Sequence, residues 1–172
     1  MRFGDFLKAT VLLSAGSATL LAALTVIGLA QEADRTLVLF SAIWWAGSVL
    51  IGIWFGRRAE ASPPIARLLA GAKTQTTLPE LRPGLTLLNR LWPLLFVTLA
   101  SSIMSVIEPQ VASVAAGFTI IWALAWRRQD AAVVAIEERD GARFYVDKTS
   151  PFHPIRLVRT PGFGGAYLRR PA

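Results

Sequence analysis

The residue types that perform most enzyme chemistry are scarce in this chain of 172 residues. It contains no cysteine, which excludes thiol nucleophiles, disulfides and cysteine-ligated metals, and its one histidine is His153. A histidine metal site needs more ligands than this one residue supplies. A serine–histidine relay inside a membrane needs a histidine within an apolar segment, and none is there. The sequence therefore predicts no catalytic residue, no cofactor and no metal site.

Hydroxyl side chains form one candidate polar face in an apolar stretch. They are three or four residues apart, which places them largely on one side of a helix: Thr98, Ser101, Ser102 and Ser105. They could line a path for a small solute, but hydroxyls in membrane helices more often bond the carbonyls of their own preceding turn or bridge to neighbouring helices. No charged residue or histidine interrupts the apolar segments, which disfavours ion-coupled transport.

The C-terminal tail interleaves arginines with apolar residues, and this pattern suits contact with another molecule. Its candidate contact residues are Phe152, Arg156, Leu157, Arg159, Phe163, Arg169 and Arg170. Anionic lipid headgroups, an acidic partner or the edge of a sheet would each fit such a segment. The alternative is a set of solvated arginines beside a membrane. Nucleic-acid binding is not expected, because membrane topology explains most of the basicity.

The overall composition indicates a membrane protein. Hydrophobic residues make up 53% of the chain and charged residues 17%, with a mean hydropathy of +0.48. Soluble domains carry about 25% charged residues, and disordered chains are far less hydrophobic. Arginine greatly outnumbers lysine and alanine is abundant. This composition indicates a GC-rich bacterial genome, and hence the bacterial inner membrane.

Four uncharged segments of 17 to 23 residues are long enough to span a bilayer: 9–31, 36–56, 91–107 and 109–126. A helix of about 20 residues crosses a hydrocarbon core of about 30 Å. We expect an all-α membrane domain over residues 1–128, with helices at about 7–30, 36–56, 85–107 and 109–127. The short turns within each pair make them two antiparallel hairpins. The first segment could instead be a signal peptide cleaved after Ala30, but its apolar stretch is longer than a signal peptide needs.

The small residues within the helices predict where the helices pack. Helices in lipid associate through close contact of small side chains, because water is not there to drive them together. Small residues recur every four positions in the first two helices: Ser14, Ala18 and Ala22, then Ser48, Gly52 and Gly56. We expect these faces to join the first two helices to each other, with a homo-oligomer interface as the alternative.

Outside the apolar segments, the pattern predicts two smaller features. Apolar residues at helical spacing after Pro63-Pro64 indicate a short helix lying on the membrane surface within the 57–84 loop. Residues 129–172 are expected to form a cytoplasmic β-hairpin and a basic tail. The hairpin would pair 133–138 with 143–148 around Asp140-Gly141, a favoured turn dipeptide, and the tail from Thr149 onward would be extended.

Three functions remain open at this stage. The first is a non-enzymatic scaffold or accessory subunit, embedded in the lipid bilayer, whose hairpin and tail contact a partner protein, a second copy or anionic lipid. The second is a small transporter or channel that uses the hydroxyl face. A membrane enzyme acting on lipid ranks last, because Asp147 and Glu80 alone would form a poor site.

Charge asymmetry predicts the orientation of the chain. Residues 1–8, 57–90 and 127–172 together carry a net charge of +9, whereas 32–35 and Glu108 carry −2. By the positive-inside rule the first set is cytoplasmic, and so are both termini. Single cysteines at Ser62 and Thr149 should therefore resist a membrane-impermeant maleimide in intact cells, while one at Gln110 should react. Labelling of Ser62→Cys or Thr149→Cys from outside would contradict this topology.

Overall fold

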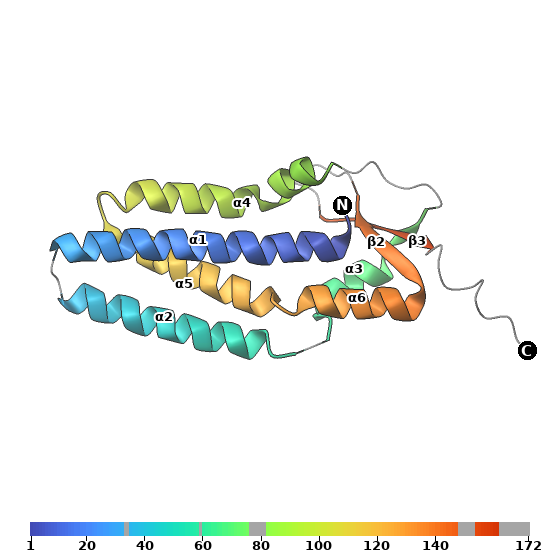
Figure 1. Ribbon diagram of the computed structural model, residues 1–172, viewed down its shortest axis with the longest axis horizontal. Coiled ribbons are helices and arrows are strands. Elements are labelled where there is room, and N and C mark those ends of the chain that lie inside the picture. Colours follow the sequence, from blue (N-terminus) through green and yellow to red (C-terminus); the bar gives the residue numbers. More distant parts are fainter. Residues whose placement is uncertain (33–34, 59, 76–81, 148–153, 162–172) are drawn as a thin grey trace, which may run out of the picture. The chain divides into compact units, whose positions relative to one another are not determined.

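The computed structural model describes residues 1–32, 35–58, 60–75, 82–147 and 154–161. The chain forms two compact units, each shown in Figure 1. The helical unit comprises Ala9–Arg58 and Leu91–Arg127, and the sheet unit comprises Met1–Lys8, Ala59–Arg90 and Arg128–Ala172.

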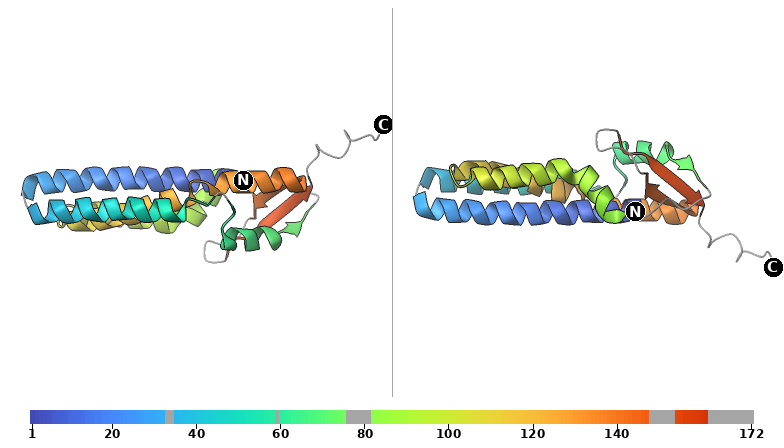
Figure 2. Two further views of the ribbon diagram at one scale, coloured as in Figure 1. Left: turned by 90° about the horizontal axis from the view of Figure 1, so that it is seen from below. Right: turned by 90° about the horizontal axis from the view of Figure 1, so that it is seen from above.

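The sequence prediction of four long apolar helices is confirmed. They are α1 (Phe3–Glu32), α2 (Arg35–Phe55), α4 (Pro83–Met104) and α5 (Pro109–Trp126). All four are long and apolar enough to cross a membrane, and in the helical unit they run side by side (Figures 1 and 2). Prolines open α4 and α5, where a missing N–H costs little. Helix α4 ends three residues before the predicted boundary, because Ser105–Ile107 form a hydrogen-bonded turn.

Helix α2 packs closely along α5. The Ser113 hydroxyl donates to the Ser41 hydroxyl at 2.8 Å, and both side chains are buried. The contacts, in order along α2, are Ser41 with Ser113, Ser48 with Gly117, Gly52 with Leu124 and Gly56 with Leu124. Residue numbers rise together in the two helices, so α2 and α5 run parallel.

Tryptophans of α2 fix this contact by hydrogen bonds to the α5 backbone. Trp44 Nε1 donates to the Val114 carbonyl at 3.2 Å, and Trp45 Nε1 donates to the Ser113 carbonyl at 3.0 Å. A Cβ atom at Gly117 would overlap the indole of Trp44. The absence of a side chain at Gly117 therefore lets the indole approach the α5 backbone.

The partner of the predicted small-residue face on α2 differs from the expectation. We expected Ser48, Gly52 and Gly56 to meet the first helix, but they meet α5. Of the matching residues on α1, Ser14 and Ala18 are buried and Ala22 is half-buried. Helix α1 also packs on α5, through Leu21, which lies in a buried cluster with Ala112, Ala115 and Ala116. Proximity along the chain suggested α1 as the partner of α2, whereas the glycine at 117 on α5 provides the complementary surface.

The sheet unit contains a three-stranded sheet with the order β1-β3-β2. The strands are β1 (Lys73–Thr74), β2 (Ala142–Val146) and β3 (Leu157–Pro161). Central β3 is antiparallel to β2 and parallel to β1. Arg2 forms an antiparallel bridge with Tyr145, and the Val146 N–H donates to the Met1 carbonyl at 3.0 Å. The start of the chain thus lies along the outer edge of β2.

A hydrophobic core holds this unit together, with apolar residues drawn from every segment of it. Its buried members include Phe3, Leu7, Ile65, Leu69, Val133, Phe144, Leu157 and Val158. Neighbouring residues on a strand point to opposite faces, and both Phe144 and Tyr145 are buried, as are Leu157 and Val158. Both faces of the sheet are therefore covered.

The predicted β-hairpin at 133–148 is wrong in its first half. Residues Gln129–Asp140 form helix α6, with Ala132, Val133 and Glu137 buried on one side. Gly141 adopts a left-handed conformation (φ 59°) and its N–H bonds to the Glu137 carbonyl, so Asp140-Gly141 ends a helix rather than turning a hairpin. The second half is a strand, β2, whose partner is β3 rather than residues 133–138.

The structure also changes two expectations for the surrounding segments. Residues 157–161 of the predicted extended tail form the central strand β3. The short helix after Pro63 is present as α3 (Pro63–Ala70), but Ile65 and Leu69 are buried within the sheet unit. The apolar side of α3 therefore packs in the protein core instead of on the membrane surface. The Ser62 N–H donates to Gln129 Oε1 at 2.8 Å, which links the start of α3 to α6.

The α2–α5 contact predicts that Gly52→Ala is destabilising. The new Cβ would lie 2.7 Å from Leu124 Cβ and 3.2 Å from Ile121 Cα, so the helices must separate. We expect a loss of about 1–3 kcal/mol, measured as a lower thermal midpoint in detergent. Gly47→Ala on the same helix is the matched control, because nothing lies within 4 Å of its new Cβ. Equal effects of the two substitutions would contradict this packing.

Candidate functional site

The predicted hydroxyl face of α4 is occupied by hydrogen bonds within the helix. Thr98 Oγ1 donates to the Leu94 carbonyl at 2.8 Å, and Ser102 Oγ donates to the Thr98 carbonyl at 2.7 Å. Ser105 Oγ donates to the Ser102 carbonyl at 2.7 Å. Ser101 is buried, as are Thr98 and Ser105. Three of the four hydroxyls thus bond to their own helix, which is the alternative that the sequence favoured over a polar path.

The tail residues predicted to contact a partner fall into two groups. Phe152, Phe163, Arg169 and Arg170 lie outside the described residues, as does His153. The others are Arg156, which is exposed, Arg159, which is half-buried, and Leu157, which is buried. Leu157 was expected to face a partner, but it starts the central strand and its side chain is in the core.

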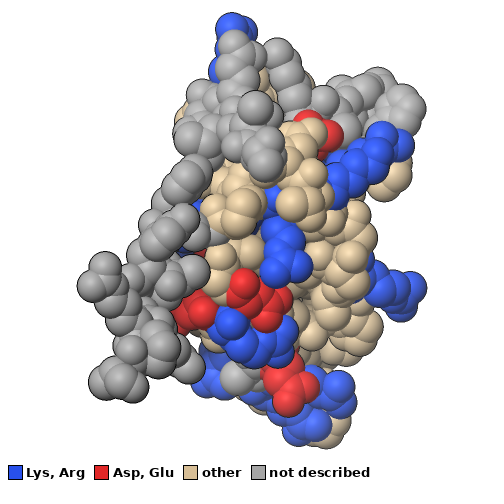
Figure 3. Space-filling view, turned by 90° about the vertical axis from the view of Figure 1, so that its right-hand side faces the viewer, with Lys and Arg blue, Asp and Glu red and all other residues tan. Residues whose placement is uncertain are grey.

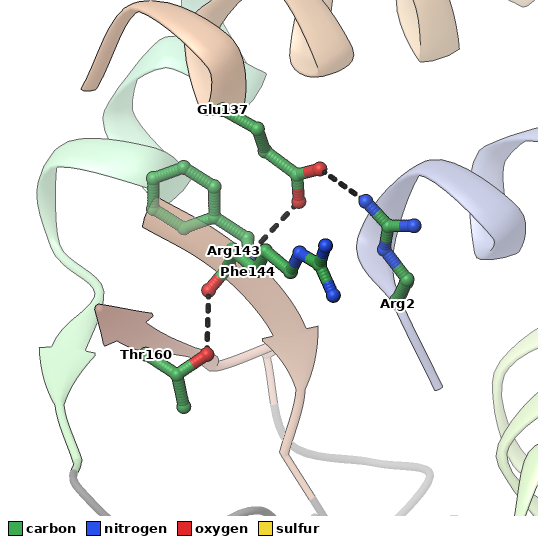
Figure 4. A network of polar contacts seen from close by, with 5 residues as sticks. All are labelled: Arg2, Glu137, Arg143, Phe144 and Thr160. Atoms are coloured by element: carbon green, nitrogen blue, oxygen red, sulfur yellow. Dashed lines mark hydrogen bonds and ion pairs between the residues drawn. The ribbon is translucent and has the colours of Figure 1, made fainter. Parts of the chain in front are cut away.

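A buried carboxylate that the sequence analysis did not single out joins the start of the chain, α6 and β2 (Figure 4). Glu137 of α6 accepts a hydrogen bond from Arg2 Nη2 at 2.9 Å through one oxygen. Its other oxygen accepts the backbone N–H of Phe144 at 2.9 Å. The Glu137 side chain is 5% exposed, so these bonds replace water around a buried charge. We interpret this network as structural.

Basic residues gather around a cleft at another side of the same unit. The cleft has a volume of about 400 Å³, and its charged lining residues are Arg67, Lys73, Asp147 and Arg156. The buried residues Leu157 and Val158 form part of its wall. Figure 3 looks onto the sheet unit and shows blue Lys and Arg side chains spread over this end, with red carboxylates beside some of them.

Three elements bring the charged residues of the cleft together. Arg67 is on α3, between the buried residues Ile65 and Leu69, and is exposed. Lys73 starts β1, which pairs with β3. The Asp147 N–H donates to the Arg156 carbonyl at 2.9 Å, which extends the β2–β3 pairing by one position. Asp147 and Arg156 therefore lie opposite each other on neighbouring segments.

The described lining residues of the cleft include three cations and one carboxylate, so their summed charge is positive. Among the described residues, the ion pairs involve neither Arg67 nor Lys73 nor Arg156. Their exposed side chains therefore remain available to an anion. Sequence reasoning identified Arg156 alone among these three, because Arg67 and Lys73 lie about 80 residues away and only the β1–β3 pairing unites them.

Comparison with family models, with curated proteins and with solved structures finds no match to this chain. Within the described residues, no group of three or more histidine, aspartate or glutamate side chains is placed to hold a metal ion.

The Glu137 network predicts a specific loss of stability in the sheet unit. Glu137→Ala leaves the Phe144 N–H without its acceptor and Arg2 without its ion pair. We expect a loss of about 1–3 kcal/mol, seen as faster hydrogen exchange at Phe144 and Tyr145. Glu137→Gln should lose less, because it retains an acceptor oxygen. The neighbouring exposed residue provides the control, Glu138→Ala. Similar exchange in Glu137→Ala and this control would refute the role of Glu137.

Proposed function

We propose that this chain is a non-enzymatic protein of the bacterial inner membrane that acts as a scaffold or accessory subunit. In this proposal two antiparallel helical hairpins anchor it in the lipid bilayer, and both termini are cytoplasmic. The sheet unit then lies at the cytoplasmic surface, where it contacts an acidic partner protein, a second copy of the chain or anionic lipid.

The assembly of the sheet unit from three separate segments is the observation that carries this proposal. Residues 1–2 lie along β2, and β1 pairs with β3, so the segments 1–8, 59–90 and 128–172 fold together. Segments that share one sheet must be on the same side of a membrane. Helices α1 and α2 separate the first two segments, and α4 and α5 separate the last two. If both helices between two successive segments cross the membrane, the chain returns to the side on which it started. A helical hairpin between each pair of segments therefore keeps all three segments on one side.

Two further observations support the same topology. Helices α2 and α5 run parallel, as the second helices of two successive hairpins would. The segments that build the sheet unit carry most of the basic residues, and the positive-inside rule assigns such segments to the cytoplasm.

The exposed surface of the helices fits a lipid environment. Large apolar side chains of α2 are exposed along much of its length, including Leu39, Ile43, Leu50 and Phe55. At the end of this helix, Arg57 lies over the Trp54 ring at 3.8 Å from its centroid. Tryptophan and arginine together are typical of the boundary between hydrocarbon and headgroups.

The scaffold role is favoured over the transporter alternative by what the side chains do. Most hydroxyls of the candidate polar face bond within α4, so they offer few groups to a permeating solute. In contrast, the sheet unit has a buried hydrophobic core and a cleft lined by basic residues. The third alternative, an enzyme that acts on lipid, is not favoured, because the described residues do not bring together an acid and a base for catalysis.

The topology can be tested by a cysteine cross-link between β1 and β3, because α4 and α5 lie between these two strands in the chain. Thr74 and Arg159 are partners across β1 and β3, and the chain has no native cysteine. We expect Thr74→Cys with Arg159→Cys to cross-link within one chain in inverted membrane vesicles, detected by mass spectrometry. The control pair, Thr74→Cys with Glu108→Cys, should not react. If the first pair does not cross-link in a folded protein, β1 and β3 do not lie together on the same side of the membrane, and the proposed topology is contradicted.

The scaffold role predicts that partners depend on the sheet unit. Truncation after Arg128 removes α6, β2 and β3, while the apolar helices keep their internal backbone hydrogen bonds. We expect the truncated chain to remain monodisperse in mild detergent and to lose co-purifying proteins. Truncation after Pro161 retains all three strands and, of the candidate contacts, removes only Phe163, Arg169 and Arg170, so it separates the role of the folded strands from that of the residues that follow them. Unchanged recovery of partners after the first truncation, or solute uptake by liposomes containing the chain, would favour the transporter alternative.

A further inference from the structure

We propose that the basic cleft of the sheet unit binds a phosphate monoester. The proposal uses the three cations Arg67, Lys73 and Arg156 as the binding groups, with Asp147 as a carboxylate that limits the affinity. It rests on the proposed function only in placing the cleft at the membrane surface, where the monoester can belong to a lipid headgroup or to a soluble metabolite.

The charge of the cleft matches this ligand. Among the described lining residues, three cations and one carboxylate leave a charge of +2, and a phosphate monoester carries about −1.5 to −2 at neutral pH. A diester carries one charge fewer and a carboxylate offers fewer oxygens. The cleft therefore discriminates among anions by charge, and the monoester is the best match.

The donor set also suits phosphate. Each arginine presents a planar fork of N–H groups that can bind two oxygens of one phosphate. Lys73 adds a compact charge, and Gln75, which also lines the cleft, adds an amide. Gln75 is held in place because its own N–H donates to the Arg159 carbonyl at 3.0 Å. The donors thus come from α3, from β1 and the residue after it, and from the segment before β3.

The size of the cleft and its apolar wall limit the ligand to a small molecule or headgroup. Ligand sites usually have volumes of about 300–1,000 Å³, and this one, at about 400 Å³, is near the lower end. Leu157 and Val158 are buried and belong to the paired central strand, so this part of the wall is built into the sheet. A phosphate with a short organic group, such as glycerol, fits within such a space.

The main experiment measures binding of glycerol 3-phosphate to the full chain in phosphatidylcholine nanodiscs by calorimetry. We expect Arg67→Gln and Arg156→Gln each to weaken binding about tenfold, the effect of losing one charged hydrogen-bonding group. Asp147→Asn should strengthen binding, because it removes the carboxylate. Arg143→Gln is the matched control, since Arg143 is an exposed arginine of β2 that does not line the cleft.

Lipid competition identifies the source of the phosphate. Nanodiscs that contain phosphatidic acid, a monoester lipid, should reduce glycerol 3-phosphate binding if a lipid headgroup enters the cleft. If binding is unchanged, the ligand is a soluble monoester. Equal competition by phosphatidylglycerol, a diester lipid, would overturn the charge selectivity proposed here.

The proposal is overturned if the wild-type chain binds no glycerol 3-phosphate, or if the arginine variants match Arg143→Gln while thermal unfolding shows that all are folded. A failure of Asp147→Asn to raise the affinity would also contradict the assigned roles. These results are separable from the scaffold role. Loss of phosphate binding with intact partner recovery would leave the scaffold proposal standing, and the reverse result would leave the cleft proposal standing.

Discussion

The backbone pairing of β3 with both β1 and β2 is the constraint on which the rest of the sheet unit depends. The β1–β3 pairing joins Lys73 to Val158, 85 residues later in the chain, and the edge of β2 is closed by the first two residues of the chain. The core packs against this sheet, the Glu137 network ties α6 to it, and the basic cleft opens beside it. Without the pairing, Lys73 and Arg156 would have no reason to be neighbours.

The two units are stabilised by different physics. In the sheet unit, aromatic and aliphatic side chains leave water, as in any soluble core. The helical unit exposes many large apolar residues and buries small or hydroxyl ones, including Ser48, Gly52 and Gly117. That inversion is expected where lipid surrounds the helices, because close backbone approach replaces the hydrophobic effect. Trp44 and Trp45 add directional hydrogen bonds that set the register of α2 on α5.

Hydropathy and charge were sufficient to predict the four long helices and the helix after Pro63, because those signals are local. Residues 129–140 were misassigned since Val133, Val134 and Ile136 favour strands, and Asp-Gly serves both hairpin turns and helix ends. The alternation at 155–159 was interpreted as part of an extended tail that could add to the edge of another sheet, whereas residues 157–161 form the central strand of the chain's own sheet. The cleft and the Arg2–Glu137 pair could not be predicted, because they depend on contacts between distant segments.

The position of β3 at the centre of the sheet has a consequence for biogenesis. Of the described strands it is the last one made, so a ribosome must complete the four long apolar helices before the sheet can close. Until then β1 and β2 present open edges, which chaperones and proteases recognise in incomplete chains. Under the proposed topology, a chain that fails to insert one helix brings its strands to opposite sides of the membrane and cannot close the sheet. In that arrangement, folding of the sheet unit depends on correct insertion of the helices.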